Sequence, residues 1–427
     1  MKRNICKMYR MEQLWIVGSL LLCLTGCGTK AASGGEGVSG QAPAAQIETA
    51  SAQAEYVSEQ TVSEQTEAGQ RVALSYAQEF TLDRYDNGCT LIGISDGTYY
   101  LVVPEELEDI PDEELKAGVS CPGAVTLLRQ PVDQIYLVAS AVMDMFCELD
   151  GLSSIRLSGT DAEGWYIEEA RAAMEAGDIL YAGKYNAPDY ELILSEGCKL
   201  AVENTMISHS PEVKENLIFC GIPVLVDYSS YESHPLGRVE WIKVYGALLG
   251  REEEAERIFA AQEALLLQVE EELAQAEGNA AGSQDGRPAV AFFYITNNGA
   301  ANVRRPSDYV PKMIELAGGA YIYHDPGEEE SRASSMTMQI EEFYATAKDA
   351  DYIIYNSAID GEVGSLEELY AKCGLLADFK AVKEGNVYCT TKNLYQESMS
   401  VGGLIQDIHV MLTQGKEGQM EYLYPVE

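Results

Sequence analysis

Positive charge is scarce in this sequence of 427 residues. It holds 29 Lys and Arg against 68 Asp and Glu, which gives a formal net charge of −39. Binding to nucleic acid or to anionic lipid through charge needs clustered Lys and Arg, so the composition argues against both. We expect no nucleic-acid partner and an acidic, well-solvated surface.

Histidine is also scarce, and the common phosphate-binding and zinc-protease motifs are absent. The four histidines, His209, His234, His324 and His409, never form a pair at i, i+4, so no metal site made of side chains is expected. His409 fits a structural role on an apolar helix, and His234 fits a turn or cap. The sequence contains no GKS, GKT or HExxH, and its GxSxG string, Gly93–Gly97, coincides with a turn signal at 95–97. We therefore predict no enzyme activity and no cofactor.

The ten cysteines never form a CxxC pair, which excludes zinc-ribbon and thioredoxin-like sites. Cys147, Cys198, Cys220 and Cys389 lie in or beside apolar runs, which is typical of small buried hydrophobic residues. The sequence is compatible with a disulfide between Cys89 and Cys121 but does not establish one.

No apolar run after residue 27 reaches the ~20 residues of a membrane helix. Residues 1–13 are basic and 14–26 are apolar, which predicts a signal peptide over 1–26. Its end, Leu24-Thr25-Gly26-Cys27, resembles the bacterial lipoprotein signal, which implies cleavage before Cys27 and a lipid on its thiol. Residues 27–70 are small and polar and predict a flexible tether.

Beyond the tether, the pattern predicts an α/β lobe over 71–237. Turn signals at 86–88 and 95–97 indicate short antiparallel strands first. Helical and strand patterns then alternate, which predicts a parallel sheet with helices on both faces. The strands are expected at 134–139, 154–158, 199–203 and 222–227, and the helices at 141–152, 165–177, 187–197 and 210–221.

Residues 238–280 predict two linking helices. The first covers 238–250, and the second, 251–278, has no Gly or Pro before its end and would measure roughly 40 Å. Its apolar positions are too irregular for a coiled-coil seam, so we expect a helix that lies across the protein.

A second α/β lobe is predicted over 281–427. Its strands are expected at 289–296, 320–324, 351–357 and 386–391, and its helices at 308–319, 339–350, 365–376 and 400–412. The predicted fold class is α/β: two parallel-sheet lobes joined by a single long spine helix, with a ligand cleft between the lobes.

Four segments of this arrangement carry a family resemblance: "EVKENLIFCGIPVLV", "YESHPLGRVEWIKVYGALLG", "DYVPKMIELAGGAYIY" and "FKAVKEGNVYC". Roughly residues 75–415 resemble the substrate-binding lipoproteins of ABC importers, in the helical-backbone class that serves iron–siderophore, haem and cobalamin uptake. The resemblance implies a monomer on the extracytoplasmic face of the membrane, held by its lipid, in a cell that lacks an outer membrane. It implies an ABC permease with its ATPase as partners, and a small metal chelate as ligand.

Ligands of open parallel sheets bind at the carboxyl ends of the strands. The residues expected there are Ser158, Thr160, Trp165, Tyr166, Lys184, Tyr185, Asn204, Tyr231, Asn297, Asn302, Arg304, Arg305 and Tyr395. A guanidinium fork grips carboxylate or catecholate oxygens, so Arg304 and Arg305 favour an anionic ligand. The alternative is that the arginines are simply exposed and the aromatic residues belong to the core.

The family resemblance also implies one carboxylate per lobe that docks on the permease. Glu212 and Glu367 fit, because each lies in the first turn of a helix after a strand loop; capping is the alternative role. Glu232 and Glu362 are rivals. We expect a ferric-siderophore-type ligand, with haem or a corrinoid as the alternative. A tethered enzyme and a sensor or structural lipoprotein remain the alternatives from other classes.

Overall fold

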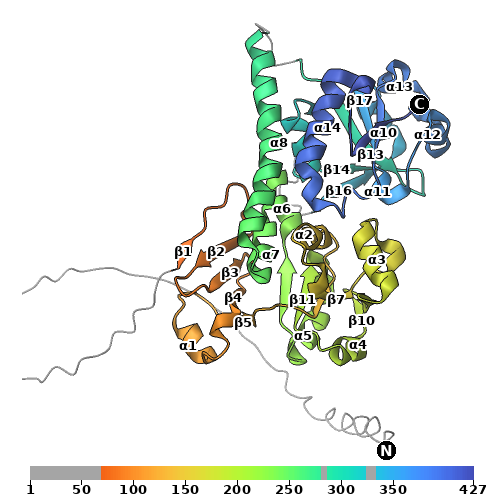
Figure 1. The fold of residues 1–427 in the computed structure, drawn as a ribbon. Coiled ribbons are helices and arrows are strands. Elements are labelled where there is room, and N and C mark those ends of the chain that lie inside the picture. Colours follow the sequence, from red (N-terminus) through yellow and green to blue (C-terminus); the bar gives the residue numbers. More distant parts are fainter. Residues whose placement is uncertain (1–68, 280–285, 324–332) are drawn as a thin grey trace, which may run out of the picture. The chain divides into compact units, whose positions relative to one another are not determined.

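The computed structural model describes residues 69–279, 286–323 and 333–427, all within one compact unit (Figure 1). The predicted signal peptide, Cys27 and nearly all of the tether lie outside the described residues. Within the described residues, no helix is both long enough and apolar enough to cross a membrane.

The fold begins with a five-stranded sheet in the order β1-β2-β3-β4-β5. The first four strands pair antiparallel, as predicted, and both turn glycines, Gly88 and Gly97, have a positive φ. The fifth strand pairs parallel with β4, which the sequence did not indicate. The elements are β1 (Gln70–Arg71), β2 (Phe80–Arg84), β3 (Thr90–Ile94), β4 (Tyr99–Val103), α1 (Asp112–Ala117) and β5 (Val125–Arg129).

The first lobe is a parallel sheet in the order β12-β11-β6-β7-β8. Its strands are β6 (Ile135–Leu137), β7 (Ile155–Ser158), β8 (Leu180–Tyr181), β11 (Leu200–Asn204) and β12 (Val224–Asp227). Its helices are α2 (Val142–Glu148), α3 (Glu168–Ala176), α4 (Tyr190–Ser195) and α5 (Pro211–Phe219). The start of the helix predicted at 187–197 is instead a strand, β10 (Ala187–Pro188), paired with β9 (Gly183–Lys184).

Three helices link the lobes, where two were predicted. The first predicted helix begins earlier and is split at Trp241 into α6 (Pro235–Glu240) and α7 (Ile242–Leu249). Pro235 starts α6, and His234 caps it by accepting a hydrogen bond from the Leu236 amide, as predicted for this histidine. The spine helix α8 (Glu252–Asn279) has 28 residues and packs against α7 and α14.

The second lobe has a seven-stranded mixed sheet. Four strands, β15, β13, β17 and β18, are parallel as predicted, while β14, β16 and β19 are antiparallel. The strands are β13 (Ala289–Ile295), β14 (Ala301–Arg304), β15 (Ala320–Tyr321), β16 (Ser335–Met338), β17 (Tyr352–Tyr355), β18 (Val387–Thr390) and β19 (Leu423–Pro425). The helices are α9 (Tyr309–Leu316), α10 (Ile340–Ala347), α11 (Ser357–Asp360), α12 (Leu366–Lys372), α13 (Lys380–Glu384) and α14 (Val401–Gln414).

A second connection between the lobes is made by hydrogen bonds of the segment before α14. We call residues 396–399 the lobe bridge, because this second-lobe segment contacts loops and helix α2 of the first lobe. The hydrogen bonds are Tyr166 N to Gln396 Oε1 (2.7 Å), Gln396 Nε2 to Gly164 O (2.7 Å), Ser398 Oγ to Ala141 O (2.6 Å) and Met399 N to Asp144 Oδ2 (2.7 Å). The two lobes are therefore held together at two places.

Candidate functional site

A cavity of about 270 Å³ lies at the carboxyl ends of the first-lobe strands. We call it the edge cavity; it is lined by Val138, Ser140, Gly159, Thr160, Asp161, Gly164, Lys184, Tyr185 and Asn204. Four of the thirteen predicted ligand residues, Thr160, Lys184, Tyr185 and Asn204, meet in this cavity. The structure thus brings together side chains from the ends of β7, β9 and β11, at the sheet edge where the topology rule places ligands.

The loops of the edge cavity are fixed by local hydrogen bonds. The Ser158 hydroxyl donates to the Thr160 carbonyl (2.6 Å) and accepts from the Thr160 amide (3.0 Å). Asn204 Nδ2 donates to the Val138 carbonyl at 3.3 Å. Gly159 has no room for a side chain, because a Cβ there would lie 3.0 Å from Val138. The cavity wall is therefore largely pre-formed.

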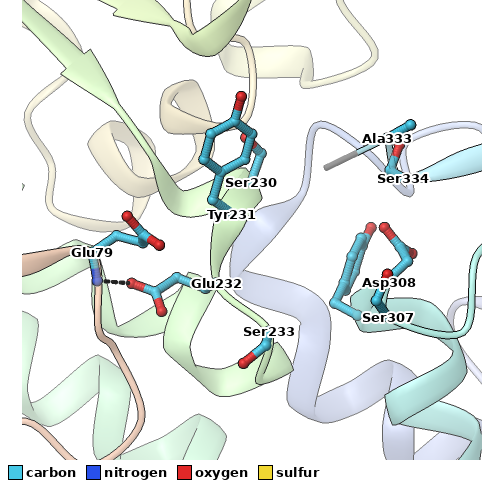
Figure 2. Close-up of a pocket in the computed structure, with 10 residues that line it drawn as sticks. Glu79, Ser230, Tyr231, Glu232, Ser233, Ser307, Asp308, Ala333 and Ser334 are labelled. Carbon is cyan, nitrogen blue, oxygen red and sulfur yellow. Dashed lines mark hydrogen bonds between the residues drawn. The ribbon is translucent and has the colours of Figure 1, made fainter. Parts of the chain in front are cut away.

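A second cavity, of about 230 Å³, lies between the two lobes (Figure 2). We call it the lobe cavity. Its first-lobe side comes from residue Glu79 and the segment after β12, and its second-lobe side from the start of α9 and the segment before β16. The lining residues are Glu79, Ser230, Tyr231, Glu232, Ser233, Ser307, Asp308, Tyr309, Ala333 and Ser334. Tyr231 is the only described residue of the predicted set in this wall.

The two cavities adjoin along the edge of the first-lobe sheet. Asn204 lines the edge cavity, and its neighbour Thr205 has its Oγ1 3.5 Å from Ser230 Oγ, which lines the lobe cavity. Strands β11 and β12, which precede Thr205 and Ser230, are paired in parallel. The segments that follow these two strands thus bring the walls of the two cavities near each other.

Two predicted ligand residues, Ser158 and Trp165, belong to the core instead. Trp165 is 1% exposed, and its indole Nε1 lies 3.3 Å from Ser158 Oγ, the acceptor of its hydrogen bond. Ser158 is also fully buried. Neither residue lines the edge cavity or the lobe cavity, so this part of the prediction is corrected.

Arg304 was expected in a loop but lies in strand β14, which forms a hairpin with β13. Its guanidinium holds Asp308 in a two-point contact, with Nε–Oδ1 and Nη2–Oδ2 both at 2.8 Å. Tyr395, which was also predicted to bind ligand, is a second partner of Arg304. Its hydroxyl accepts hydrogen bonds from Arg304 Nη1 at 3.4 Å and from Asn356 Nδ2 at 2.8 Å. The Arg304 guanidinium, which was predicted to bind an anionic ligand, is thus engaged in contacts within the protein.

The remaining predicted residues are scattered. Asn302 donates to Thr337 Oγ1 across the β14–β16 pair at 3.0 Å, and Asn297 is exposed in the turn after β13. Arg305 is partly buried, and its amide bonds to the Ser334 carbonyl at 3.0 Å. Tyr166 is 45% exposed and lines a separate acidic hollow beside the lobe bridge.

Glu203 is a buried acid in the strand predicted over 199–203. It lies in strand β11, is fully buried, and neither carboxylate oxygen has a hydrogen-bond partner among the described residues. Burial raises the pKa of Glu203 to about 8. A carboxyl group that holds its proton at neutral pH therefore lies one residue before Asn204 of the edge cavity.

The two predicted docking residues are exposed. Glu212 lies in the first turn of α5 and Glu367 in the first turn of α12. Capping of α12 is performed by the neighbours of Glu367: Ser365 Oγ accepts from the Glu368 amide (3.3 Å), and Glu368 Oε2 accepts from the Gly364 amide (2.8 Å).

The two rival docking residues are otherwise engaged. Glu232 is 3% exposed, so it is corrected to a structural role, and Glu362 pairs with Lys392 at 2.9 Å.

Within the described residues, the structure shows no group of three or more His, Cys, Asp or Glu that could hold a metal ion. His409 is buried, with Nδ1 3.0 Å from the Ala317 carbonyl and Nε2 3.3 Å from Glu272, which fits the predicted structural role. Cys89 and Cys121 are both free thiols, so the structure contains no bridge between them.

Comparison with known proteins gives distant relatives. No family model matches the chain. An uncharacterized lipoprotein of Methanocaldococcus jannaschii is 26% identical over 238 residues, which are 54% of this chain and 52% of the relative. A second uncharacterized lipoprotein of that organism is 23% identical over 367 residues, 82% of this chain and 86% of the relative. The chain thus spans about half the length of the first relative and most of the second.

Among solved structures, a periplasmic heme binding protein from Pseudomonas aeruginosa superimposes with a TM-score of 0.55 at 13% identity, covering 69% of this chain and 97% of that protein. The fold is that of a two-lobe periplasmic binding protein. The predicted α/β fold with a spine helix is therefore confirmed. In this binding-protein fold, both cavities lie at the carboxyl ends of the first-lobe strands, and the lobe cavity has walls from both lobes.

Proposed function

We propose that this chain is the extracytoplasmic substrate-binding lipoprotein of an ABC importer. It binds its ligand reversibly in the adjoining cavities and delivers it to the permease, without making or breaking covalent bonds. The observation that carries the proposal is the lobe cavity, which is walled by residues of both lobes next to a pre-formed polar edge cavity.

We propose a bulky metal chelate of the ferric-siderophore type as the ligand, with haem or a corrinoid as the alternative. The adjoining cavities suit a ligand larger than either one alone, and Lys184, Tyr185 and Tyr231 offer a cation and two aromatic faces. The heme-binding protein of the same fold from Pseudomonas aeruginosa supports a large metal-containing ligand. The metal would arrive already chelated.

Delivery requires that the protein stays near its permease. We propose that a lipid on Cys27 and the polar segment 27–70 hold it there, and that Glu212 and Glu367 dock on permease cations. Both carboxylates are exposed, and each belongs to a different lobe. Two acyl chains on one cysteine would give stable anchoring, whereas a single chain is marginal.

Fluorescence titration of the purified chain tests the proposal. The predicted mature chain has two tryptophans, and Trp165 follows Gly164 of the edge-cavity wall, so a bound coloured chelate should quench its emission. We expect at least one of a ferric hydroxamate, a ferric catecholate, haem and cyanocobalamin to bind with a Kd of about 1 μM or below.

The variant Lys184→Met should weaken that binding about tenfold, because it removes the cation of the edge cavity. Lys199→Met is the matched control, since Lys199 is exposed and pairs with Asp133 away from the cavity. If all four compounds fail to quench at 100 μM, the transport proposal is wrong.

A further inference from the structure

The residues that line the lobe cavity indicate which chemical group of the ligand binds there. We propose that Glu79 selects the ligand by accepting a positively charged group, so that the preferred cargo is a metal chelate with a pendant ammonium. The inference rests on the proposed function and makes it more specific. It reverses the anionic preference that Arg304 and Arg305 suggested from the sequence.

Three carboxylates line the lobe cavity, and two of them are already engaged. Asp308 is held by both guanidinium contacts of Arg304. Glu232 accepts hydrogen bonds from two backbone amides and from the indole of Trp241 at 3.0 Å. Both carboxylates are therefore engaged in contacts within the protein.

The Glu79 carboxylate differs from these two. It makes no hydrogen bond or ion pair with any described residue, and it lies beside Glu232 on the first-lobe side of the cavity (Figure 2). None of the described lining residues is a Lys, Arg or His. Because a cavity is less polarisable than water, a charge there attracts an opposite charge more strongly than at the open surface.

The backbone around Glu79 is fixed by buried acids. We call residues 75–79 the N-terminal strap. Glu240 accepts hydrogen bonds from the amides of Ser75, Tyr76 and Ala77 at 2.8–2.9 Å, and Glu232 accepts from those of Gln78 and Glu79 at 2.9–3.0 Å. Every amide of the strap is thus bound to the carboxylate of Glu232 or Glu240.

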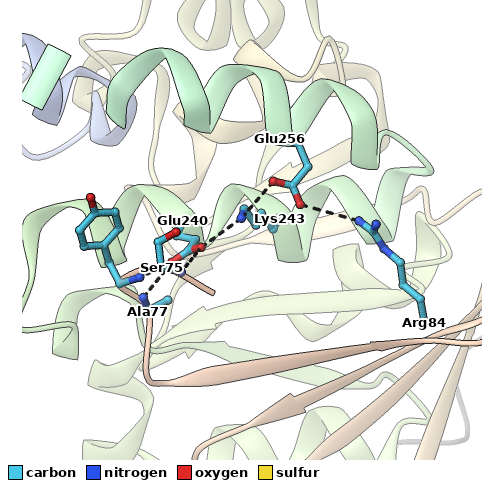
Figure 3. A network of polar contacts seen from close by, with 7 residues as sticks. Ser75, Ala77, Arg84, Glu240, Lys243 and Glu256 are labelled. Atoms are coloured by element: carbon cyan, nitrogen blue, oxygen red, sulfur yellow. Dashed lines mark hydrogen bonds and ion pairs between the residues drawn. The ribbon is translucent and has the colours of Figure 1, made fainter. Parts of the chain in front are cut away.

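These acids anchor the strap to the linking helices (Figure 3). Glu240 is fully buried and pairs with Lys243 at 3.0 Å, and Lys243 also contacts Glu256 of the spine helix at 3.0 Å. Arg84 of β2 extends the network, with its Nη2 4.0 Å from Glu256. The strap therefore has a defined position, and a ligand that meets Glu79 need not order the backbone first.

Four serine hydroxyls also line the lobe cavity. Ser307 and Ser334 come from the second lobe, across from Glu79, and Ser230 and Ser233 come from the first lobe, on its own side. Hydroxyls both donate and accept hydrogen bonds, so they can accept the remaining N–H groups of an ammonium. A cavity that combines a carboxylate with hydroxyls is a suitable receptor for such a cation.

Two chelates of matched shape test this inference: ferrioxamine B, which carries a free ammonium, and its N-acetylated neutral derivative. We expect the natural chain to bind the ammonium form about tenfold more tightly, a difference of about 1.4 kcal/mol. Glu79→Gln should abolish the preference, and Glu79→Lys should invert it. The control Glu175→Gln removes an exposed acid of α3 and should leave the preference unchanged.

The outcomes separate this inference from the proposed function. Equal affinity of the natural chain for both ferrioxamines overturns the role of Glu79, and so does a preference that survives in Glu79→Gln. If neither ferrioxamine binds while haem or cyanocobalamin does, the cationic ligand is wrong and the transport proposal stands. If no chelate of any kind binds, both are wrong. Unchanged thermal unfolding of Glu79→Gln verifies that its fold is intact.

Discussion

Glu203 shows how one buried side chain makes stability depend on pH. Its carboxyl group lies among apolar residues, and burial raises its pKa to about 8, against a usual value of 4.5. Between these values the folded chain holds a proton that the unfolded chain has lost. Its contribution is therefore fully present below about pH 4.5 and is lost as pH rises through about 8.

The variant Glu203→Gln should remove this part of the pH dependence, because an amide does not titrate. We expect the free energy of unfolding of the natural chain to fall more steeply between pH 5 and 8.5, by up to about 1.4 kcal/mol per pH unit relative to the variant. Denaturant unfolding at a series of pH values measures this. Parallel curves for both proteins would show that Glu203 is not protonated in the fold.

The residues of the two cavities show which ligand-binding positions can be predicted from the sequence and which cannot. Thr160, Lys184, Tyr185 and Asn204 were found because they follow strands whose ends meet at one edge. The same rule selected Trp165, which is buried, since spacing after a strand does not say where a side chain points. Glu79 was missed because it precedes β2, far in sequence from the strands that carry the rest of the wall.

The position of the N-terminal strap depends on residues that are far away in the sequence. Its contacts with Glu240 join residues 163 to 165 positions apart, and no local pattern encodes such pairs. Helices and parallel strands, by contrast, follow from local periodicity, so most of them were predicted. The hairpin of β13 and β14 was missed although "TNNGA" carries a turn signal, because the segment was interpreted as a ligand loop.

Glu240→Gln tests how strongly the strap is held. It breaks a buried ion pair and weakens three hydrogen bonds, so we expect a loss of roughly 3 kcal/mol in the free energy of unfolding. Amide hydrogen exchange at residues 75–77 should accelerate as well. Glu256→Gln is the matched control: it removes the other partner of Lys243, but Glu256 is 42% exposed, and we expect a loss below about 1 kcal/mol. Equal losses in the two variants would show that Glu240 does not anchor the strap.

For the whole molecule, the alternation of strands and helices predicted two lobes and a spine, and the structure has both. The lobe bridge was not predictable, because its four hydrogen bonds join residues 230 to 257 positions apart. It adds a connection between the lobes to the packing of the linking helices on α9 and α14.

The proposed docking concerns the whole molecule, because it would use one carboxylate from each lobe. The double variant Glu212→Gln/Glu367→Gln should bind ligand as tightly as the natural chain, yet lose at least about tenfold in stimulation of the permease ATPase reconstituted in liposomes. The control Glu175→Gln/Glu384→Gln removes the same number of exposed charges, one per lobe. If the two double variants stimulate the ATPase equally, the carboxylates are not docking contacts.

The lobe bridge also affects how empty and loaded copies of the protein would compete for the permease. With lobes joined at two places, the empty and the loaded protein would present nearly the same outline to the permease. Exposed carboxylates such as Glu212 and Glu367 would then fit the permease in both states. An empty copy would occupy the permease without delivering anything, so a cell that makes more of this protein than it has ligand would slow its own uptake.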